Sequence, residues 1–306
     1  MTVLTSKSIR PRAFSYLIAL VLSIASMSTI ADGCKKEIKR KNIIGNALFT
    51  TLFRSINGKL NSWEDLRESL TYGAGAGYLF YKSREMIGNG DESRGLATAY
   101  LASSVTENVT LGHHPLSHLR YGVGPMEVRW ATPFAPYSEN KFNFSINAFD
   151  AFGALSAAVS GKAKDFKLKN GILTATDNSL VGDGFHALAR EKTVITRQGN
   201  QSDQGLWHHE LIHTTQYIQF SSFGSTNLNI LGLNDSLLPN DLLSNSSNTM
   251  SVRIEWFNAL INAIDQNRDY EDRWMEIEAA KFGQDSSPLH DDDGSCSAQL
   301  SFQFQL

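Results

Sequence analysis

Two histidines four positions apart bracket a glutamate, in the order His209, Glu210 and His213, within the stretch WHHELIHTTQ. Residues four apart lie on one face of an α-helix, so both imidazoles can face one ion if this stretch is helical. The surrounding pattern favours a helix over 206–220. Glu210 would project to the side where a water molecule beside the ion would sit. The motif therefore predicts a helix here with a metal site on it.

A third protein ligand must come from elsewhere, because two imidazoles leave a catalytic zinc ion one ligand short. The extended motif with a glycine and a third histidine is absent, since Gln216 and Gln219 stand at those positions. A glutamate on a separate helix is the other solution, and WMEIEAAKFG at 274–283 supplies Glu276 and Glu278. Two residues apart on a helix means about 200° around its axis, so only one of them can face the ion.

The two segments together resemble the two-part signature of gluzincin metallopeptidases, in which a glutamate of an E-x-E-A helix completes the zinc site. HELIH at 209–213 and EIEAAKFG at 276–283 carry the likeness, and Glu276 aligns with the ligand. Gln216 also resembles the HExxHxxQ variant of bacterial zincin-like domains. The resemblance implies one Zn²⁺ per chain, held by the two motif histidines and Glu276. Glu255 is the alternative third ligand.

The same resemblance implies a peptidase that acts on a peptide or protein substrate, with Glu210 as the general base. A strand over 191–197, just before the motif helix, is expected to present a free edge to an extended substrate. In many gluzincins an aspartate four residues after the glutamate ligand orients a histidine, but here that position is Ala280. This departure and the asparagine-rich segment 221–249 support the alternative, a zinc-stabilised structural or interaction protein of the cell envelope that cleaves nothing.

Four further side chains are candidates to support the metal site or to stabilise an oxyanion. Each carries a donor that can bind developing negative charge, and the sequence does not choose among them. They are His186, Tyr217, Tyr270 and Arg273.

The pattern of apolar residues predicts an α+β fold. Helical periodicity runs from 43 to 109, interrupted by Asn-Gly and Gly-Asn-Gly breaks. The period then shifts towards two over 119–197, where Asn170-Gly171 suits a tight hairpin turn. Beyond the motif helix, further helices are expected near 251–265 and 270–283. GAGAG at 73–77 lacks the strand and lysine of a phosphate loop, which favours close packing of helices through small residues.

These elements predict a division of the chain into four parts. A signal peptide or membrane anchor is expected over 1–31, a helical N-terminal region over 32–118, a zincin-like domain over 119–285 and a C-terminal tail over 286–306. In the zincin-like domain, a β-sheet precedes the HExxH helix and the glutamate helix. The tail ends in an alternating strand pattern from Leu300 to Leu306.

The N-terminus points to export. Basic residues precede an apolar stretch over 13–27, and Thr29-Ile30-Ala31 offers a small-x-small cleavage pattern. The basic run that follows at 35–41 opposes translocation, so an uncleaved anchor with membrane association stays open. Cys34 and Cys296 are the two cysteines, and either one disulfide or two unpaired thiols are consistent with the sequence. A net charge of -3 argues against a nucleic-acid partner.

Overall fold

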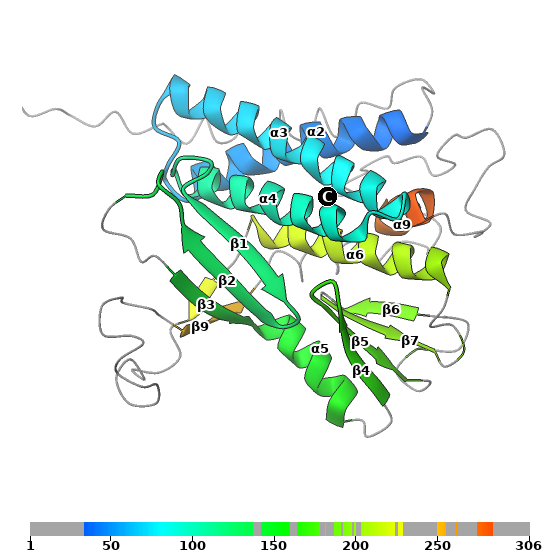
Figure 1. The fold of residues 1–306 in the computed structure, drawn as a ribbon. Coiled ribbons are helices and arrows are strands. Elements are labelled where there is room, and N and C mark those ends of the chain that lie inside the picture. Colours follow the sequence, from blue (N-terminus) through cyan, green and yellow to red (C-terminus); the bar gives the residue numbers. More distant parts are fainter. Residues whose placement is uncertain are drawn as a thin grey trace, which may run out of the picture.

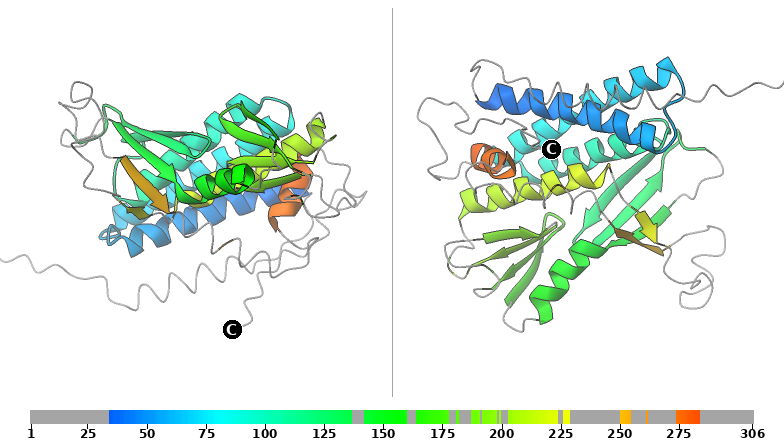
Figure 2. Two further views of the ribbon diagram at one scale, coloured as in Figure 1. Left: turned by 90° about the horizontal axis from the view of Figure 1, so that it is seen from below. Right: turned by 180° about the vertical axis from the view of Figure 1, so that it is seen from behind.

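A computed structural model of the chain describes residues 34–136, 142–159, 164–177, 181, 187–190, 192–197, 199, 203–223, 226–228, 250–254, 261 and 274–283. Helices and strands both contribute, so the α+β class predicted from the sequence is confirmed. The long helices lie side by side in the upper half of Figure 1, and two separate sheets lie below them. Figure 2 shows the same arrangement from below and from behind.

Three helices open the described chain: α2 (Cys34–Ile56), α3 (Trp63–Gly88) and α4 (Glu92–Thr110). Their bounds agree with the helical periodicity, except that α2 begins earlier and includes the basic run. Ser62 caps α3, because its side chain accepts from the Asp65 backbone while the Asp65 carboxylate accepts from Ser62. The cap fixes the point at which α3 starts.

Glycines bring α2 and α3 into close contact. A Cβ atom on Gly77 would lie 2.3 Å from the carbonyl oxygen of Asn42, and one on Gly73 would lie 2.8 Å from the Cα atom of Ala47. Any larger residue would push the helices apart. The prediction that the GAGAG segment serves helix packing is confirmed.

The first sheet has the strand order β1-β2-β3-β9-β8. Its strands are β1 (His118–Val123), β2 (Met126–Ala131), β3 (Phe142–Asn147), β9 (Met250–Ile254) and β8 (Thr226–Leu228). The prediction of a helix near 251–265 is wrong for its first residues, since 250–254 form a strand parallel to β3. The alternating apolar residues there suit either structure, and the pairing available along β3 decides the outcome.

A helix also interrupts the segment predicted to be β-rich. Helix α5 (Ala148–Val159) follows β3 directly, with the sequence AFDAFGALSAAV. Alanine and leucine favour a helix, and the Asn147 side chain accepts a hydrogen bond from the Asp150 backbone at its start. The alternating pattern of the preceding strand led to a β prediction for these residues as well.

The second sheet has the order β4-β5-β7-β6, from β4 (Lys164–Lys169), β5 (Ile172–Thr176), β6 (Ala187–Arg190) and β7 (Thr193–Thr196). The predicted hairpin turn joins β4 to β5, with φ of 53° at Asn170 and 83° at Gly171. Two successive positive φ angles are typical of a type I′ turn.

The strand before the motif helix is not the edge strand that was expected. β7 pairs with β5 on one side and with β6 on the other, so it lies inside the sheet. Within the described residues, the edge beside β7 is β6, whose sequence ALAR has no β-branched residue and gave no strand signal. This correction moves the free edge to residues 187–190.

The motif helix α6 (Gln204–Ser221) lies between the N-terminal helices and the second sheet, with α9 (Trp274–Gly283) beside it (Figure 1). One apolar cluster joins side chains of these elements, including Phe80, Leu96, Val194, Leu211 and Ala279. The helices of 34–110 thus share a core with the segment that carries the motif. In the described part of the chain, no helix has the length and apolar character needed to cross a membrane.

Several sequence predictions fall outside the described residues. They concern the leader over 1–31, the C-terminal strand pattern and the partner cysteine Cys296. Cys34 begins α2, but its pairing with Cys296 rests on a residue beyond the described part of the chain. Most of the helix near 251–265 and the start of the one near 270–283 lie there too.

Candidate metal centre

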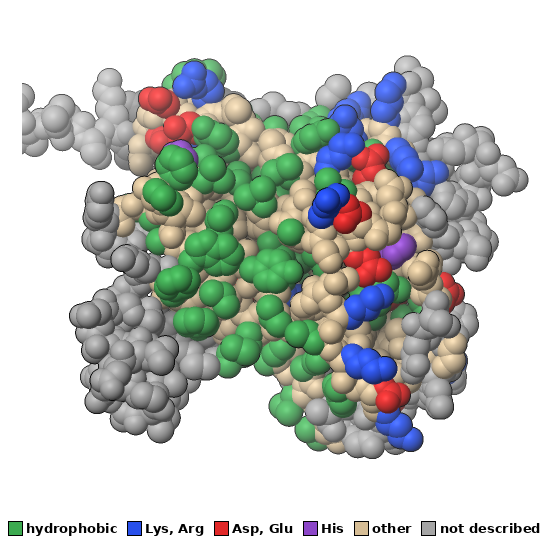
Figure 3. All heavy atoms as spheres, in the orientation of Figure 1, with side chains coloured by type: hydrophobic (Ala, Val, Ile, Leu, Met, Phe, Trp, Pro, Cys, Tyr) green, Lys and Arg blue, Asp and Glu red, His purple; other side chains and the backbone are tan. Residues whose placement is uncertain are grey.

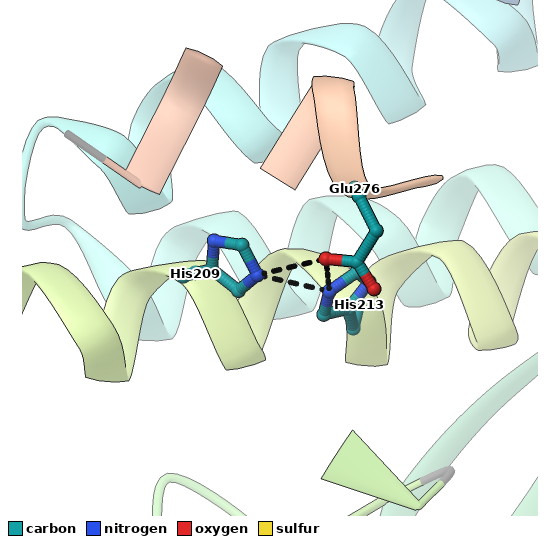
Figure 4. A group of neighbouring side chains, drawn as sticks. All are labelled: His209, His213 and Glu276. Atoms are coloured by element: carbon teal, nitrogen blue, oxygen red, sulfur yellow. Dashed lines mark hydrogen bonds and ion pairs between the residues drawn. The ribbon is translucent and has the colours of Figure 1, made fainter. Parts of the chain in front are cut away.

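His209, His213 and Glu276 meet between α6 and α9 (Figure 4). The two histidine Nε2 atoms are 3.1 Å apart, and Glu276 Oε2 lies 3.3 Å from His209 Nε2 and 3.2 Å from His213 Nε2. Both imidazoles are buried and the carboxylate is partly buried. The structure therefore brings together the three side chains that the sequence assigns to a metal.

The side chains of helix α6 are held in place because other elements cover the helix. Asp203 caps its first turn by accepting from the Leu206 backbone, and Trp207 is 93% covered. His209, Glu210 and His213 are also buried. A helix covered by the N-terminal helices on one side and by a sheet on the other holds its side chains in fixed rotamers.

Helix α9 approaches α6 closely because Gly283 faces His209. A Cβ atom on Gly283 would lie 2.8 Å from the His209 Cα atom, so a side chain there would separate the helices. Glu276, nearly two turns earlier, reaches the histidines, while Glu278 points elsewhere. The two glutamates diverge as their helical spacing predicts.

The geometry of the three ligand atoms suits a tetrahedral zinc ion. Bonds of about 2.0–2.1 Å place the ligands of such an ion about 3.3 Å from one another. The observed separations of 3.1–3.3 Å agree with this edge length. Two imidazole nitrogens and one carboxylate oxygen also form the donor set of hydrolytic zinc sites. The residues present therefore fit the ion.

Gln216 orients one of the candidate ligands. Its Oε1 atom lies 2.8 Å from His213 Nδ1, which assigns the ring proton to Nδ1 and directs the Nε2 lone pair towards the cluster. Its Nε2 atom donates to the Met275 carbonyl and to Glu278. In many gluzincins an aspartate at the position of Ala280 orients a histidine. Here Gln216, from the motif helix itself, contacts the second nitrogen of His213.

Glu278 connects this glutamine to the N-terminal helices. Its Oε2 atom accepts from Gln216, while its Oε1 atom accepts from Arg84 at 2.6 Å and from Asn42 at 2.7 Å. Arg84 is fully buried and also donates to Thr215. The sequence gave no sign of this network, because Arg84 and Glu278 are 194 residues apart.

Glu210 lies beside the cluster in a dry environment. Burial raises the pKa of its carboxyl group, and the nearby rings of His213 and His209 act in the opposite direction. The backbone N–H of Ala189, on the edge strand β6, donates to the same carboxylate. The glutamate that a hydrolase would use as a base thus faces the edge of the second sheet.

The charges of the cluster stabilise one another. Burial alone would lower the pKa of His213, but attraction to Glu276 and a hydrogen bond donated to its carboxylate raise it to about 9. Burial acts to raise the pKa of Glu276, and the opposing attraction of His213 and His209 holds it well below its usual range.

Most other candidates cannot be placed. Tyr217 packs against both apolar clusters of the helical layer. The other oxyanion candidates lie outside the described residues; these are His186, Tyr270 and Arg273. The alternative ligand Glu255 lies outside them too. His208 lies next to the motif, and its Nε2 atom is 3.4 Å from Glu92 Oε1. Within the described residues, the group able to hold a metal is the one formed by α6 and α9.

Comparison of the chain with protein-family models, with curated proteins and with solved structures found no match. The likeness to gluzincins therefore stands on the two short motifs. What supports a function is the placement of these motifs in the fold and the chemistry of their side chains.

Proposed function

We propose that this protein is a zinc-dependent metallopeptidase of zincin-like architecture. The observation that carries the proposal is the triangle of His209 Nε2, His213 Nε2 and Glu276 Oε2, with sides of 3.1–3.3 Å. Glu210 lies one residue after the first ligand and is buried beside them. The order of the chain supports the architecture, since a sheet precedes the motif helix and a glutamate helix follows it.

A zinc ion held by these residues would polarise a substrate carbonyl and lower the pKa of a water molecule. Glu210 accepts the proton of that water and passes it to the leaving amine. Burial suits the carboxylate to this task, because a raised pKa brings a carboxyl group closer to the working pH. Gln216 keeps His213 in the tautomer that presents Nε2 to the ion.

The edge strand β6 supports the choice of a peptide substrate. Ala189 lies opposite Val194 of β7, and its N–H points away from β7 to Glu210. In the described part of the chain, no strand pairs with β6 on that side. An extended peptide can therefore approach this edge of the sheet, with its backbone running past Glu210. We also propose an exported location, with residues 1–31 as signal or anchor.

Metal removal tests the proposed activity. We expect the purified protein to cleave peptides of a broad synthetic library, to lose cleavage with 1,10-phenanthroline and to regain it with one equivalent of Zn²⁺. Mass spectrometry of the library measures the cleaved bonds. A protein that binds zinc and loses thermal stability with the chelator, yet cleaves no peptide in either state, is a zinc-stabilised structural protein and would overturn the peptidase proposal.

A further inference from the structure

The first sheet turns apolar side chains outwards and charged side chains inwards, the reverse of the usual arrangement in a soluble protein. Side chains alternate between its faces, and the cross-strand register places nine residues of β1, β2 and β3 on the face opposite to the buried Arg120 and Glu127, although Tyr121 at its margin also contacts Tyr100 of α4. All nine are apolar: Leu119, Tyr121, Val123, Met126, Val128, Trp130, Phe142, Phe144 and Ile146. We call these residues the outer sheet face. No charged side chain belongs to it.

The opposite face of the same strands is polar and buried. Arg120 lies 3.1 Å from Glu107 and 3.5 Å from Glu127, and also donates to the Ile218 carbonyl of α6. Lys192, just before β7, lies 3.0 Å from Asp150 and 3.5 Å from Glu127. Buried charges of this kind cost free energy even when paired. A sheet that turns paired charges inwards and nine apolar residues outwards is built to meet another apolar surface.

The outer sheet face is accessible. Exposed fractions reach 51% at Met126, 49% at Phe142 and 42% at Phe144. Figure 3 shows hydrophobic side chains gathered over β1, β2 and the neighbouring helices, whereas lysine and arginine side chains gather on the other side of this view. Apolar patches of this size on soluble proteins mark interaction sites.

We propose that the outer sheet face is the contact surface between two copies of this chain. Large apolar side chains carry about 200 Å² each, so the exposed fractions leave on the order of 500 Å² on this face. Two copies would then bury about 1,000 Å², the lower limit for a biological interface and the size expected of a weak, reversible dimer. A neutral face can pack on its own copy without repulsion between like charges, sheet on sheet about 10 Å apart.

Composition and charge favour a protein partner over a lipid surface. Tyrosine, tryptophan, phenylalanine and methionine supply five of the nine residues, and these types are enriched in the cores of protein interfaces. Binding to a lipid surface usually combines apolar residues with lysine and arginine around them. The net charge of -3 and the position of the basic side chains in Figure 3 do not provide that combination.

Sedimentation velocity of the full chain over about 1–100 µM tests this interface. We expect a dimer that Phe144→Lys dissociates, raising its dissociation constant by about a hundredfold or more, because two copies would oppose like charges. Met126→Lys, at a more exposed site, should act in the same direction and guards against misfolding of the first variant. Leu168→Lys is the matched control, since Leu168 is 58% exposed on β4 of the other sheet, and it should remain dimeric.

Two results would overturn the interface. One is a monomeric wild type over the whole concentration range; if that monomer also floats with lipid vesicles and Phe144→Lys abolishes the flotation, the face is a membrane surface. The other is a dimer that the Phe144 and Met126 variants leave unchanged. An anchor retained at the N-terminus would be common to all the variants, so it cannot produce a difference between them.

Discussion

Replacement of Glu210 by glutamine is expected to lower kcat/KM for peptide cleavage by a factor of about 10²–10⁴. Glutamine has the size of glutamate and can accept the Ala189 N–H, but it cannot take a proton from water. Because Glu210 supplies none of the three ligand atoms, the variant should keep its zinc. Its melting temperature should stay within a few degrees of wild type. Kinetics on one cleaved library peptide measure the effect.

His208→Gln is the control for this variant. It changes a neighbouring histidine that contacts Glu92 and not the ligand triangle, so cleavage should change by no more than about twofold. Equal cleavage rates for wild type and Glu210→Gln would exclude this glutamate as the general base. The proposed chemistry would then need a different proton acceptor.

Replacement of Glu278 by alanine should lower the free energy of unfolding by about 3–5 kcal/mol. The change leaves the fully buried Arg84 guanidinium without its carboxylate partner, at a site with no access to water. It also removes an acceptor of Gln216 and Asn42. Urea unfolding, followed by circular dichroism, measures the loss.

A double variant separates the structural part of this role from the positioning part. Arg84→Met with Glu278→Met removes both charges and fills the space, so it should recover most of the stability lost in Glu278→Ala. Gln216 remains without its carboxylate support, and zinc affinity should stay about 10–100-fold below wild type. If the double variant binds zinc as tightly as wild type, Glu278 stabilises the fold without positioning His213.

The sequence predicted the parts of the site that depend on local pattern. Four-residue spacing placed His209 and His213 on one helix face, and two-residue spacing showed that Glu276 and Glu278 must diverge. Long-range contacts have no such signature. The pairing of Arg84 with Glu278 became visible only in the fold, and the part played by Gln216 had one weak sign, its position three residues after His213.

The sheets show a different limit of sequence pattern. Alternation in MEVRW and FNFSIN predicts strands, but period two is equally consistent with either face being buried. The usual rule that apolar side chains face the core would place Phe144 inside, whereas the burial of Arg120 and Glu127 on the opposite face places it outside. The edge strand was misplaced for a related reason: β6 has no β-branched residue, whereas β7 has the sequence TVIT and gave the stronger signal.

Metal content is the most direct test of the central claim, that His209, His213 and Glu276 form a zinc site. We expect mass spectrometry of the purified full chain to find about one zinc per molecule, and His213→Ala and Glu276→Ala to find almost none. Lys281→Gln is the matched control on α9. Lys281 is partly exposed and is not a ligand, so this variant should retain zinc after purification. A wild type without metal, or equal zinc in wild type and the two ligand variants, would contradict the account.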